Sequence, residues 1–304
     1  MSEAPTIAVV VVSFETRTTL LDGLTALERN AGIAIETVVV DNASQDGSLE
    51  AVRARFPRVR VVANAQNVGF ARACNQGVRE TRAPLVLFLN PDATLEPGAL
   101  AALASLLEAR PRVGIAGPRT RNSNGDIQVS TGPDLSLASE WRQRRLVRGV
   151  VHRDPRALAA AEARHAVEHE PDWVSGACLL ARREAFLAVG GFDEGFFLYE
   201  EDADLCRRVR AAGWQVVFTP TAEVRHARGL SMARAPERSR IEYHRSHLRY
   251  YARHCDLAQR AALRLLLAGR AGLELFAATL SGDPARRREA AACLRLALAG
   301  VSAT

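Results

Sequence analysis

Residues 7 to 44 read IAVVVVSFETRTTLLDGLTALERNAGIAIETVVVDNAS, and this stretch carries the pattern on which the fold prediction rests. It opens with a continuous apolar run from Ile7 to Val12, which is typical of a buried parallel strand. Leucines at 20, 21, 24 and 27 then recur at helical spacing, and Ile35 to Val40 forms a second apolar run before Asp41. The stretch therefore predicts a strand, a helix and a second strand.

The same alternation continues to about residue 116. It predicts an α/β fold with a mostly parallel, Rossmann-like sheet flanked by helices. In such sheets, ligands bind beyond the carboxyl ends of the strands. Each of these ends is polar here, although the strands are apolar: Ser13-Phe14-Glu15, Asp41-Asn42, Asn64 to Asn67, and Asn90-Pro91-Asp92.

Charge is unevenly distributed along the chain. All 40 basic residues are arginines, and residues 225–304 carry 15 of them against six acids, a net charge of +9. Such a basic segment indicates either an anionic partner, such as a membrane surface, or a solvated helical face. No nucleic-acid motif accompanies the arginines, so a nucleic-acid partner is not expected.

Cysteine usage and the amino terminus predict where the protein resides. The five cysteines include no CxxC pair, which favours reduced thiols. No signal peptide begins the chain, and no apolar run reaches spanning length without an arginine. We expect a cytoplasmic protein, or one held peripherally at the inner face of the cell membrane.

Residues 190 to 208, GGFDEGFFLYEEDADLCRR, combine six carboxylates with an apolar patch from Phe196 to Tyr199. This mixture indicates carboxylates at the wall of a partly dry pocket, where their pKa values can be tuned. We predict that Asp202 is a catalytic base. Asp204 is expected to be structural, paired with Arg207 or Arg208.

Four polar positions have both a functional and a structural interpretation. Asp41 can accept the N3–H of uracil or thymine, or form an Asx-turn or helix cap. The Asn67-Val68-Gly69 turn can present a helix amino terminus to a phosphate, or serve as turn and cap. Asp92 suits a divalent cation, or is an ordinary turn aspartate. His226 can be a ligand or a satisfied structural histidine.

Several enzyme signatures are absent. The sequence has no GxGxxG after the first strand, no GxxxxGK and no G-x-S-x-G elbow. These absences disfavour a dinucleotide-binding fold, a P-loop enzyme and an α/β-hydrolase.

The motifs taken together resemble family 2 glycosyltransferases with the GT-A fold, and within them the rhamnosyltransferase-like branch. The likeness covers roughly residues 7 to 254 in order and spacing. The stretches that carry it are VVVVSFE at 9–15, VVVDNASQDGS at 38–48, NVGFARACNQGV at 67–78, LFLNPDA at 87–93, WVSGACLLARREAFLAVGGFDEGFFLYEEDADLCRR at 173–208 and GWQVVFTPTAEVRHARGLS at 213–231.

The resemblance implies an inverting transfer of a sugar, such as rhamnose, from a UDP- or dTDP-sugar to an acceptor hydroxyl in cell-wall or surface glycan assembly. Asp202 would be the base, with Glu201 before it, and Asp92 and His226 would hold Mg2+ or Mn2+. The donor would contact Ser13, Phe14, Glu15, Asp41, Asn42, Asn67, Arg72, Asn75, Asn90 and Asp92. The acceptor would contact Trp173, Gly176, Ala177 and Glu200.

The resemblance also implies a division of the chain. A GT-A catalytic domain would occupy residues 1–235, with a nucleotide-sugar half at about 1–120 and an acceptor and catalytic half at about 121–235. A basic helical region would follow at 236–304. A lipid-linked saccharide acceptor would agree with this basic region, whose helices could instead pack in a homo-oligomer.

Two positions depart from the family pattern. Asn90 stands at the first DxD position, which removes one carboxylate from the metal site, and Glu15 stands where Asn is usual. The QxxRW motif of processive synthases is absent. Two alternatives remain beside the transferase: a catalytically inactive nucleotide-sugar or glycan-binding module, which Asn90 favours, and a sugar nucleotidyltransferase, which would need a glycine-rich basic loop after the first strand.

Overall fold

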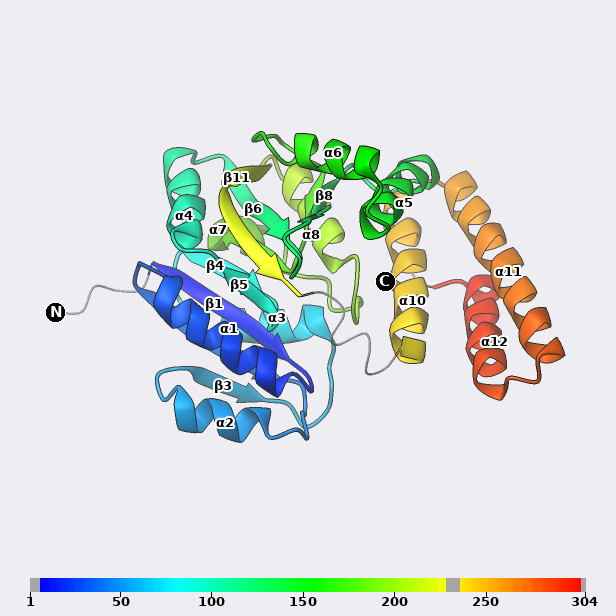
Figure 1. Cartoon of the computed structure of the whole chain (residues 1–304), viewed down its shortest axis with the longest axis horizontal. Helices are drawn as coiled ribbons and strands as arrows, with labels where there is room; N and C mark the ends of the chain where they lie inside the picture. Colours follow the sequence, from blue (N-terminus) through cyan, green and yellow to red (C-terminus); the bar gives the residue numbers. More distant parts are fainter. Residues whose placement is uncertain (1–5, 228–235, 302–304) are drawn as a thin grey trace.

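The computed structural model describes residues 6–227 and 236–301. Helices cover a mixed sheet, and a helical C-terminal segment lies to one side (Figure 1). Among the described residues the sheet has nine strands in the order β3-β2-β1-β4-β10-β6-β11-β5, with β7 paired to β6. The end of the last family motif, residues 228–231, and the predicted boundary at 235 lie outside the described residues.

The first four strands are parallel neighbours, as the sequence predicts. Helices α1, α2 and α3 connect them, and the β1–β2 register places Ser13 beside Asp41. Asp41 in turn lies beside Ala63. The polar strand ends therefore meet at one edge of the sheet. The elements are β1 (Ile7–Ser13), α1 (Arg17–Asn30), β2 (Ile35–Asp41), α2 (Ser48–Arg55), β3 (Arg60–Ala63), α3 (Phe70–Arg79) and β4 (Leu85–Leu89).

Strand β10 (Cys178–Arg182) runs antiparallel between β4 and β6. The chain reaches β10 from the carboxyl edge of the parallel strands, so β10 leads away from that edge. The segment between β6 and β10 lies beyond the alternation of strands and helices that the sequence predicts as far as about residue 116. Its elements, with the helix α4 that precedes them, are α4 (Ala99–Ala109), β6 (Val113–Arg121), β7 (Ile127–Gln128), β8 (Thr131–Gly132), α5 (Leu137–Val151), α6 (Pro155–Arg164) and β9 (Trp173–Val174).

Strand β11 (Gln215–His226) is twelve residues long. It pairs in parallel with β6, with a register shift between Thr219 and Glu223. Pro220 lies in this irregular part, where a missing N–H is tolerated. The far end of β11 pairs with β5 (Ala93–Leu95), a three-residue strand that the sequence analysis did not predict.

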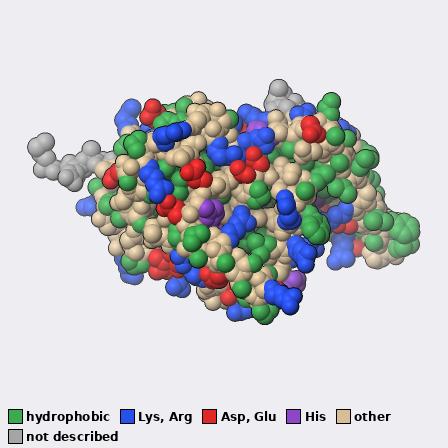
Figure 2. Space-filling view, turned by 90° about the horizontal axis from the view of Figure 1, so that it is seen from above, with side chains coloured by type: hydrophobic (Ala, Val, Ile, Leu, Met, Phe, Trp, Pro, Cys, Tyr) green, Lys and Arg blue, Asp and Glu red, His purple; other side chains and the backbone are tan. Residues whose placement is uncertain are grey.

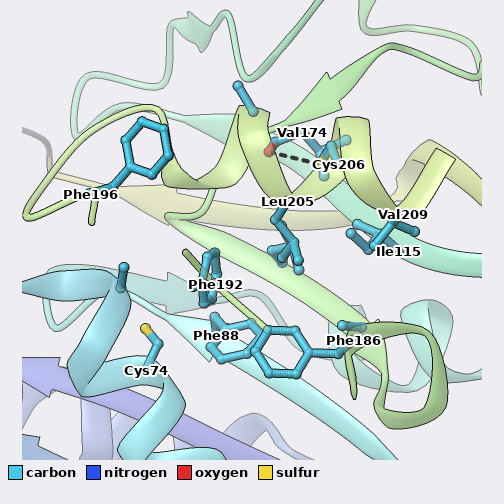
Figure 3. Close-up of a cluster of buried hydrophobic side chains, with 14 of the residues drawn as sticks. Cys74, Phe88, Ile115, Val174, Phe186, Phe192, Phe196, Leu205, Cys206 and Val209 are labelled. Atoms are coloured by element: carbon cyan, nitrogen blue, oxygen red, sulfur yellow. Dashed lines mark hydrogen bonds between the residues drawn. The ribbon is translucent and has the colours of Figure 1, made fainter. Parts of the chain in front are cut away.

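An aromatic cluster anchors the helix that follows the acid-rich stretch. Leu205, Cys206 and Val209 of α8 (Glu201–Ala211) belong to the same buried cluster as Phe88 and Phe192 (Figure 3). The rings of Phe88 and Phe192 are 4.9 Å apart and meet edge to face, a favourable aromatic arrangement. Helix α7 (Arg183–Ala188) borders the cluster. Burial of this face fixes the position of α8 against the sheet.

The C-terminal segment begins with a helix that belongs to the main core. Leu248, Tyr250 and Tyr251 of α10 (Pro236–His254) lie in the same buried cluster as β1 and β4. Helix α10 therefore packs into the same core as the strands of the sheet. Helices α11 (Leu257–Leu280) and α12 (Pro284–Ala299) form a hairpin beyond α10 (Figure 1). Within the described ranges, no helix has the length and apolar content needed to cross a membrane.

Candidate active site

The Asp41 carboxylate combines the two interpretations that its sequence position allowed. It is 3 % exposed at the end of β2, and its Oδ2 accepts the N–H of Ser44, three residues further on, at 2.9 Å, which is a local turn contact. Its Oδ1 is buried and has no hydrogen-bond partner among the described residues. A buried acceptor without a donor is costly, so this atom is suited to a donor group from a ligand.

The loops after β1 and β2 are held together by Glu15. Its backbone N–H bonds to Ser44 Oγ at 2.9 Å, and its Oε1 accepts the N–H of Gln45 at 2.6 Å. Glu15 and Ala43 both have positive φ angles, 55° and 64°, which are uncommon for residues other than glycine. The family departure at Glu15 thus has a structural use, and Phe14 beside it remains 36 % exposed.

Asn42 connects three strand-end segments. Its amide donates to the Gly69 carbonyl at 3.2 Å, and its Oδ1 accepts from Asn64 at 2.9 Å. Ser13, at the end of β1, is fully buried and lies 3.1 Å from Thr16, Oγ to Oγ1. Donor contacts of Ser13, Phe14, Glu15 and Asn42 stay predictions.

Two backbone N–H groups at the amino terminus of α3 are hydrogen-bonded within the protein. The N–H of Phe70 donates to the Phe197 carbonyl at 2.7 Å, and the N–H of Gly69 donates to Asn67 Oδ1 at 3.0 Å. Gly69 has φ +88°, and a Cβ there would lie 2.5 Å from the Phe197 oxygen. The close approach that requires glycine is therefore made by the acid loop and not by a ligand.

Arg72 and Asn75 lie one turn apart on α3, as predicted, and both contact the acid-rich stretch. Arg72 pairs with Glu194 at 2.8 Å. Asn75 donates to Glu194 and to the Phe192 carbonyl, at 3.1 and 2.9 Å, and accepts the Phe192 N–H at 3.0 Å. These bonds tie α3 to the start of the stretch. A contact of either residue with a donor stays a prediction.

Asp92 and His226 lie close together although 134 positions separate them in the sequence. His226 Nε2 is 3.2 Å from Asp92 Oδ1 and 3.3 Å from the Asn90 amide nitrogen. Gln128 holds the other side of the ring, with its Oε1 3.1 Å from Nδ1 and its amide donating to the His226 carbonyl at 2.6 Å. Gln128 was missed by the sequence analysis, because no motif marks a residue that acts through a partner 98 positions away.

These residues fit a divalent cation that is shared with a diphosphate. An oxygen acceptor at Nδ1 favours the tautomer whose Nε2 lone pair is free, which is how ligating histidines are commonly oriented. Asp92 Oδ1 and His226 Nε2 could supply two ligands, and diphosphate oxygens and water would complete the set. Among the described residues there is no group of three or more His, Cys, Asp or Glu side chains that could hold a metal by itself.

The proposed base lies at the first turn of α8, after a turn of unusual backbone. Tyr199 and Glu200 have φ angles of 74° and 63°. Asp202 follows, and its two oxygens accept backbone N–H groups, Oδ2 from Gly176 at 2.7 Å and Oδ1 from Ala203 at 2.8 Å. Burial raises the pKa of Asp202 even though these two bonds oppose the rise.

The base and the strand-end residues are joined through two consecutive residues. The N–H of Asn90 donates to the Ala177 carbonyl at 2.9 Å, and Gly176 bonds to Asp202. Only two residues, Gly176 and Ala177, thus connect Asn90 to the Asp202 carboxylate. Hydrogen bonds thus link four residues that were predicted for the site: Asn90, Gly176, Ala177 and Asp202.

The other acids of the stretch divide by their partners. Asp204 is fully buried and pairs with Arg208 at 2.6 Å, which confirms its predicted structural pairing, and with His254 at 2.7 Å. Glu201 is 5 % exposed, and burial together with the charge of Asp202 raises its pKa well above the ordinary value. The Glu200 carboxylate faces His247 of α10.

Trp173, predicted to contact the acceptor, packs against Gly132 and Pro133. Its indole N–H donates to the Pro133 carbonyl at 2.9 Å, and its ring covers Gly132, where a Cβ would lie 2.4 Å away. Acceptor contacts of Trp173, Gly176, Ala177 and Glu200 stay predictions.

A separate hollow of about 420 Å³ lies beside α3 and the start of the acid-rich stretch. Arg79, Glu194 and Arg253 line it, whereas Asp41, Asp92 and Asp202 do not. Its charged groups pair with one another, as Arg79 does with Glu194 at 3.7 Å. The hollow is therefore not the candidate active site.

Solved structures with the same arrangement identify the fold. A mannosyltransferase from Pyrobaculum calidifontis, in complex with GDP-Man and Mn2+, aligns with a TM-score of 0.60 at 19 % identity, covering 98 % of this chain and 88 % of that one. Staphylococcus aureus TarS in complex with UDP-GlcNAc aligns with a TM-score of 0.54 at 16 % identity, covering 84 % and 70 %. The fold is that of the GT-A glycosyltransferases.

Sequence relatives identify the family. The model of the family described as glycosyltransferase like family 2 matches residues 4–252. The N-acetylglucosaminyl-diphospho-decaprenol L-rhamnosyltransferase of Mycobacterium tuberculosis is 33 % identical over 255 residues, which cover 77 % of this chain and 80 % of the relative. The rhamnosyltransferase WbbL of Escherichia coli is 42 % identical over 55 residues, 18 % of this chain and 21 % of that one. The chain belongs to glycosyltransferase family 2, in its rhamnosyltransferase-like branch, and is a glycosyltransferase.

Proposed function

We propose that this protein is an inverting, metal-dependent glycosyltransferase that moves a deoxyhexose such as rhamnose from a dTDP- or UDP-sugar to a saccharide hydroxyl. The observation that carries the proposal is the connection of Asp202 to the Asn90-Pro91-Asp92 turn through Gly176 and Ala177. It sets a proton acceptor beside the strand ends, where sheets of this class bind nucleotides.

The chemistry assigned to the chain is a single displacement. The Asp202 carboxylate takes the proton of the acceptor hydroxyl while that oxygen attacks the anomeric carbon. The bond from the anomeric carbon to the diphosphate breaks on the opposite face, so the configuration inverts and the nucleoside diphosphate leaves with the bonding electrons. The raised pKa of Asp202 suits this role, because a stronger base takes a hydroxyl proton more readily.

The donor side is proposed from the strand ends. Asp41 Oδ1 is a buried acceptor that the N3–H of a uracil or thymine would satisfy. Asp92 and His226 would hold Mg2+ or Mn2+, with Gln128 orienting the ring. When bound, the cation supplies positive charge against the diphosphate. The Mn2+ in the P. calidifontis mannosyltransferase supports this assignment by analogy.

A lipid-linked saccharide of cell-wall or surface glycan assembly is the proposed acceptor. The M. tuberculosis relative is named for such a substrate, and it covers most of this chain. The C-terminal hairpin supports contact with a lipid surface. Figure 2 shows hydrophobic side chains gathered at the end of the molecule that α11 and α12 form.

The apolar face of α11 consists of five side chains that are each at least 60 % exposed: Leu265, Leu266, Leu273, Phe276 and Leu280. Their spacings of one, seven, three and four positions place them on one side of the helix. Residues 257–299 carry seven arginines against three acids, a net charge of +4. A second copy would bring two such charges together, whereas an anionic bilayer complements them.

A donor panel tests the function without knowledge of the acceptor. The full chain is incubated with dTDP- and UDP-sugars, including dTDP-rhamnose, with Mn2+ or Mg2+, and thermal stabilisation and slow release of the nucleoside diphosphate are measured. We expect stabilisation and release with one pyrimidine nucleotide-sugar, both dependent on the metal. Stabilisation without release, even with acceptor saccharides added, would indicate the inactive binding module instead.

A further inference from the structure

His247 of α10 is buried between two carboxylates from other parts of the fold. It is 1 % exposed, its Nδ1 lies 2.6 Å from Glu200 Oε1, and its Nε2 lies 3.2 Å from Glu140 Oε2. Glu140 belongs to α5, and Glu200 is the residue that precedes α8. The Nδ1 contact with Glu200 is a hydrogen bond, and Nε2 lies within ion-pair distance of Glu140, so the two carboxylates favour the charged imidazolium form of the ring.

The groups around this imidazolium balance its charge. Arg144 Nη2 lies 2.8 Å from Glu140 Oε2, and the Tyr251 hydroxyl donates to Glu140 Oε1 at 2.5 Å. The cluster therefore contains two carboxylates and two cations. The Tyr243 ring stacks on His247 at 5.6 Å and 13°. His244 is nearby on the same helix, and burial lowers its pKa to about 4, so it adds no charge at neutral pH.

The carboxylate that His247 binds belongs to the strained turn before the base. Tyr199 and Glu200 both adopt positive φ, which persists only where surrounding contacts hold it. Glu200 makes no side-chain cap for α8, so its carboxylate is committed to His247. The neighbouring Ser246 Oγ donates to the Leu198 carbonyl at 2.7 Å. Helix α10 thus contacts the turn at Leu198 and at Glu200, four and two residues before Asp202.

We propose that His247 is a positioning residue of the glycosyl transfer, which holds the 198–200 turn in its strained conformation through Glu200 and so aims the Asp202 carboxylate. This inference rests on the proposed role of Asp202. Burial opposes the charged ring, but the charge of Glu200 and the hydrogen bonds of Glu140 and Glu200 raise the pKa of His247 to about 10, so the contact is intact at neutral pH.

The test compares three variants of the full chain. His247→Gln keeps the size of the side chain and removes its charge. A displaced base costs about 10²-fold in turnover, so we expect kcat to fall by about 10- to 100-fold while the Kd of the nucleotide-sugar changes by less than about twofold. The double variant Glu200→Gln/His247→Gln restores a neutral amide contact and recovers most of the lost kcat. His152→Gln, on the exposed end of α5, is the control.

Three results would overturn the proposal: kcat of His247→Gln within twofold of the wild type, donor binding lost in parallel with kcat, or no recovery in the double variant. If His247→Gln does not fold, Ser246→Ala decides, because it removes only the bond to Leu198; kcat must fall with donor binding unchanged. Failure of the proposed function is recognised separately, since Asp202→Asn would then turn over normally whatever the His247 variants do.

Discussion

The backbone N–H of Gly176 donates a hydrogen bond of 2.7 Å to Oδ2 of Asp202. A Cβ at position 176 would lie 3.3 Å from Cβ of Asp202, so the two backbones approach closely. Ala177, the next residue, accepts the N–H of Asn90. The orientation of the Asp202 carboxylate is therefore fixed from the segment that pairs with Asn90 at the end of β4 as well as from its own helix.

Replacing the base should separate chemistry from binding. Asp202→Asn is expected to lower kcat by about 10²- to 10⁴-fold, the usual contribution of general-base catalysis. Affinity for the nucleotide should change little, because Asp202 is not among the residues proposed to contact it. Steady-state kinetics and calorimetric titration measure the two quantities, with Asp22→Asn on the exposed side of α1 as the control. Near-normal turnover would remove Asp202 from this role.

The pH profile of kcat should show the raised pKa of Asp202. The base must be deprotonated, so turnover falls as the pH falls through its pKa. Since burial raises that pKa, the loss should begin at a higher pH than for an ordinary aspartate. Turnover measured from pH 4 to 8, with binding followed in parallel, tests this. An acid limb at the ordinary aspartate value would contradict it.

Replacing Gln128 should weaken metal affinity, although Gln128 is not among the residues proposed to contact the nucleotide-sugar donor. Gln128→Leu removes the acceptor at Nδ1 of His226, which frees the ring to rotate. Outer partners of metal ligands are typically worth about 10- to 100-fold in affinity. We expect the Mn2+ concentration for half-maximal activity to rise by that factor, with Gln259→Leu on α11 unchanged. An unaltered metal requirement would argue against His226 as a ligand.

Stability should decline in alkali because of His247. Its folded pKa, about 10, lies above the unfolded value near 6.5, so its contribution is fully present below about pH 6.5 and is lost as the pH rises towards 10. The difference in unfolding free energy between wild type and His247→Gln should therefore shrink between pH 6.5 and 10. Urea denaturation at both values measures it, and a constant difference would mean that the ring is neutral.

The apolar face of α11 should bind anionic lipid. Leu273→Gln/Phe276→Gln is expected to weaken binding to phosphatidylglycerol vesicles, with little binding of either protein to phosphatidylcholine. Leu187→Gln, 57 % exposed on α7, is the matched control. Co-sedimentation at low and high salt gives the measurement. Equal vesicle binding, with a change of oligomeric state instead, would assign this face to a second copy.

The sequence predicts the parallel strands of the first half of the fold well. It predicts the strands after β4 poorly. Runs such as Ile7 to Val12 are apolar for their whole length, so each strand can be recognised from its own residues without knowledge of the neighbouring strand. Pairings between distant segments determine three other features: the three-residue β5, the antiparallel direction of β10 and the full length of β11. Local patterns cannot show these pairings.

The candidate site likewise contains residues that the sequence motifs predicted and residues that they did not. Asp92 and His226 were expected to share a ligand, and the structure sets them 3.2 Å apart. Gln128 and His247 carry no motif, because each acts on a residue that does. Gly69 was expected in a turn before a helix, but its close contact with Phe197 could not be revealed by spacing alone.

Strand β11 has a practical consequence for building hybrid enzymes. Asp92 leads into β5, and β5 pairs with the end of β11 that carries His226. An exchange of residues 1–120 alone, intended to transfer donor preference from one relative to another, would leave β5 against a foreign strand. It would also divide the proposed cation ligands Asp92 and His226 between two parental proteins. Recombination should therefore carry Gln128 and residues 215–226 along with the nucleotide half.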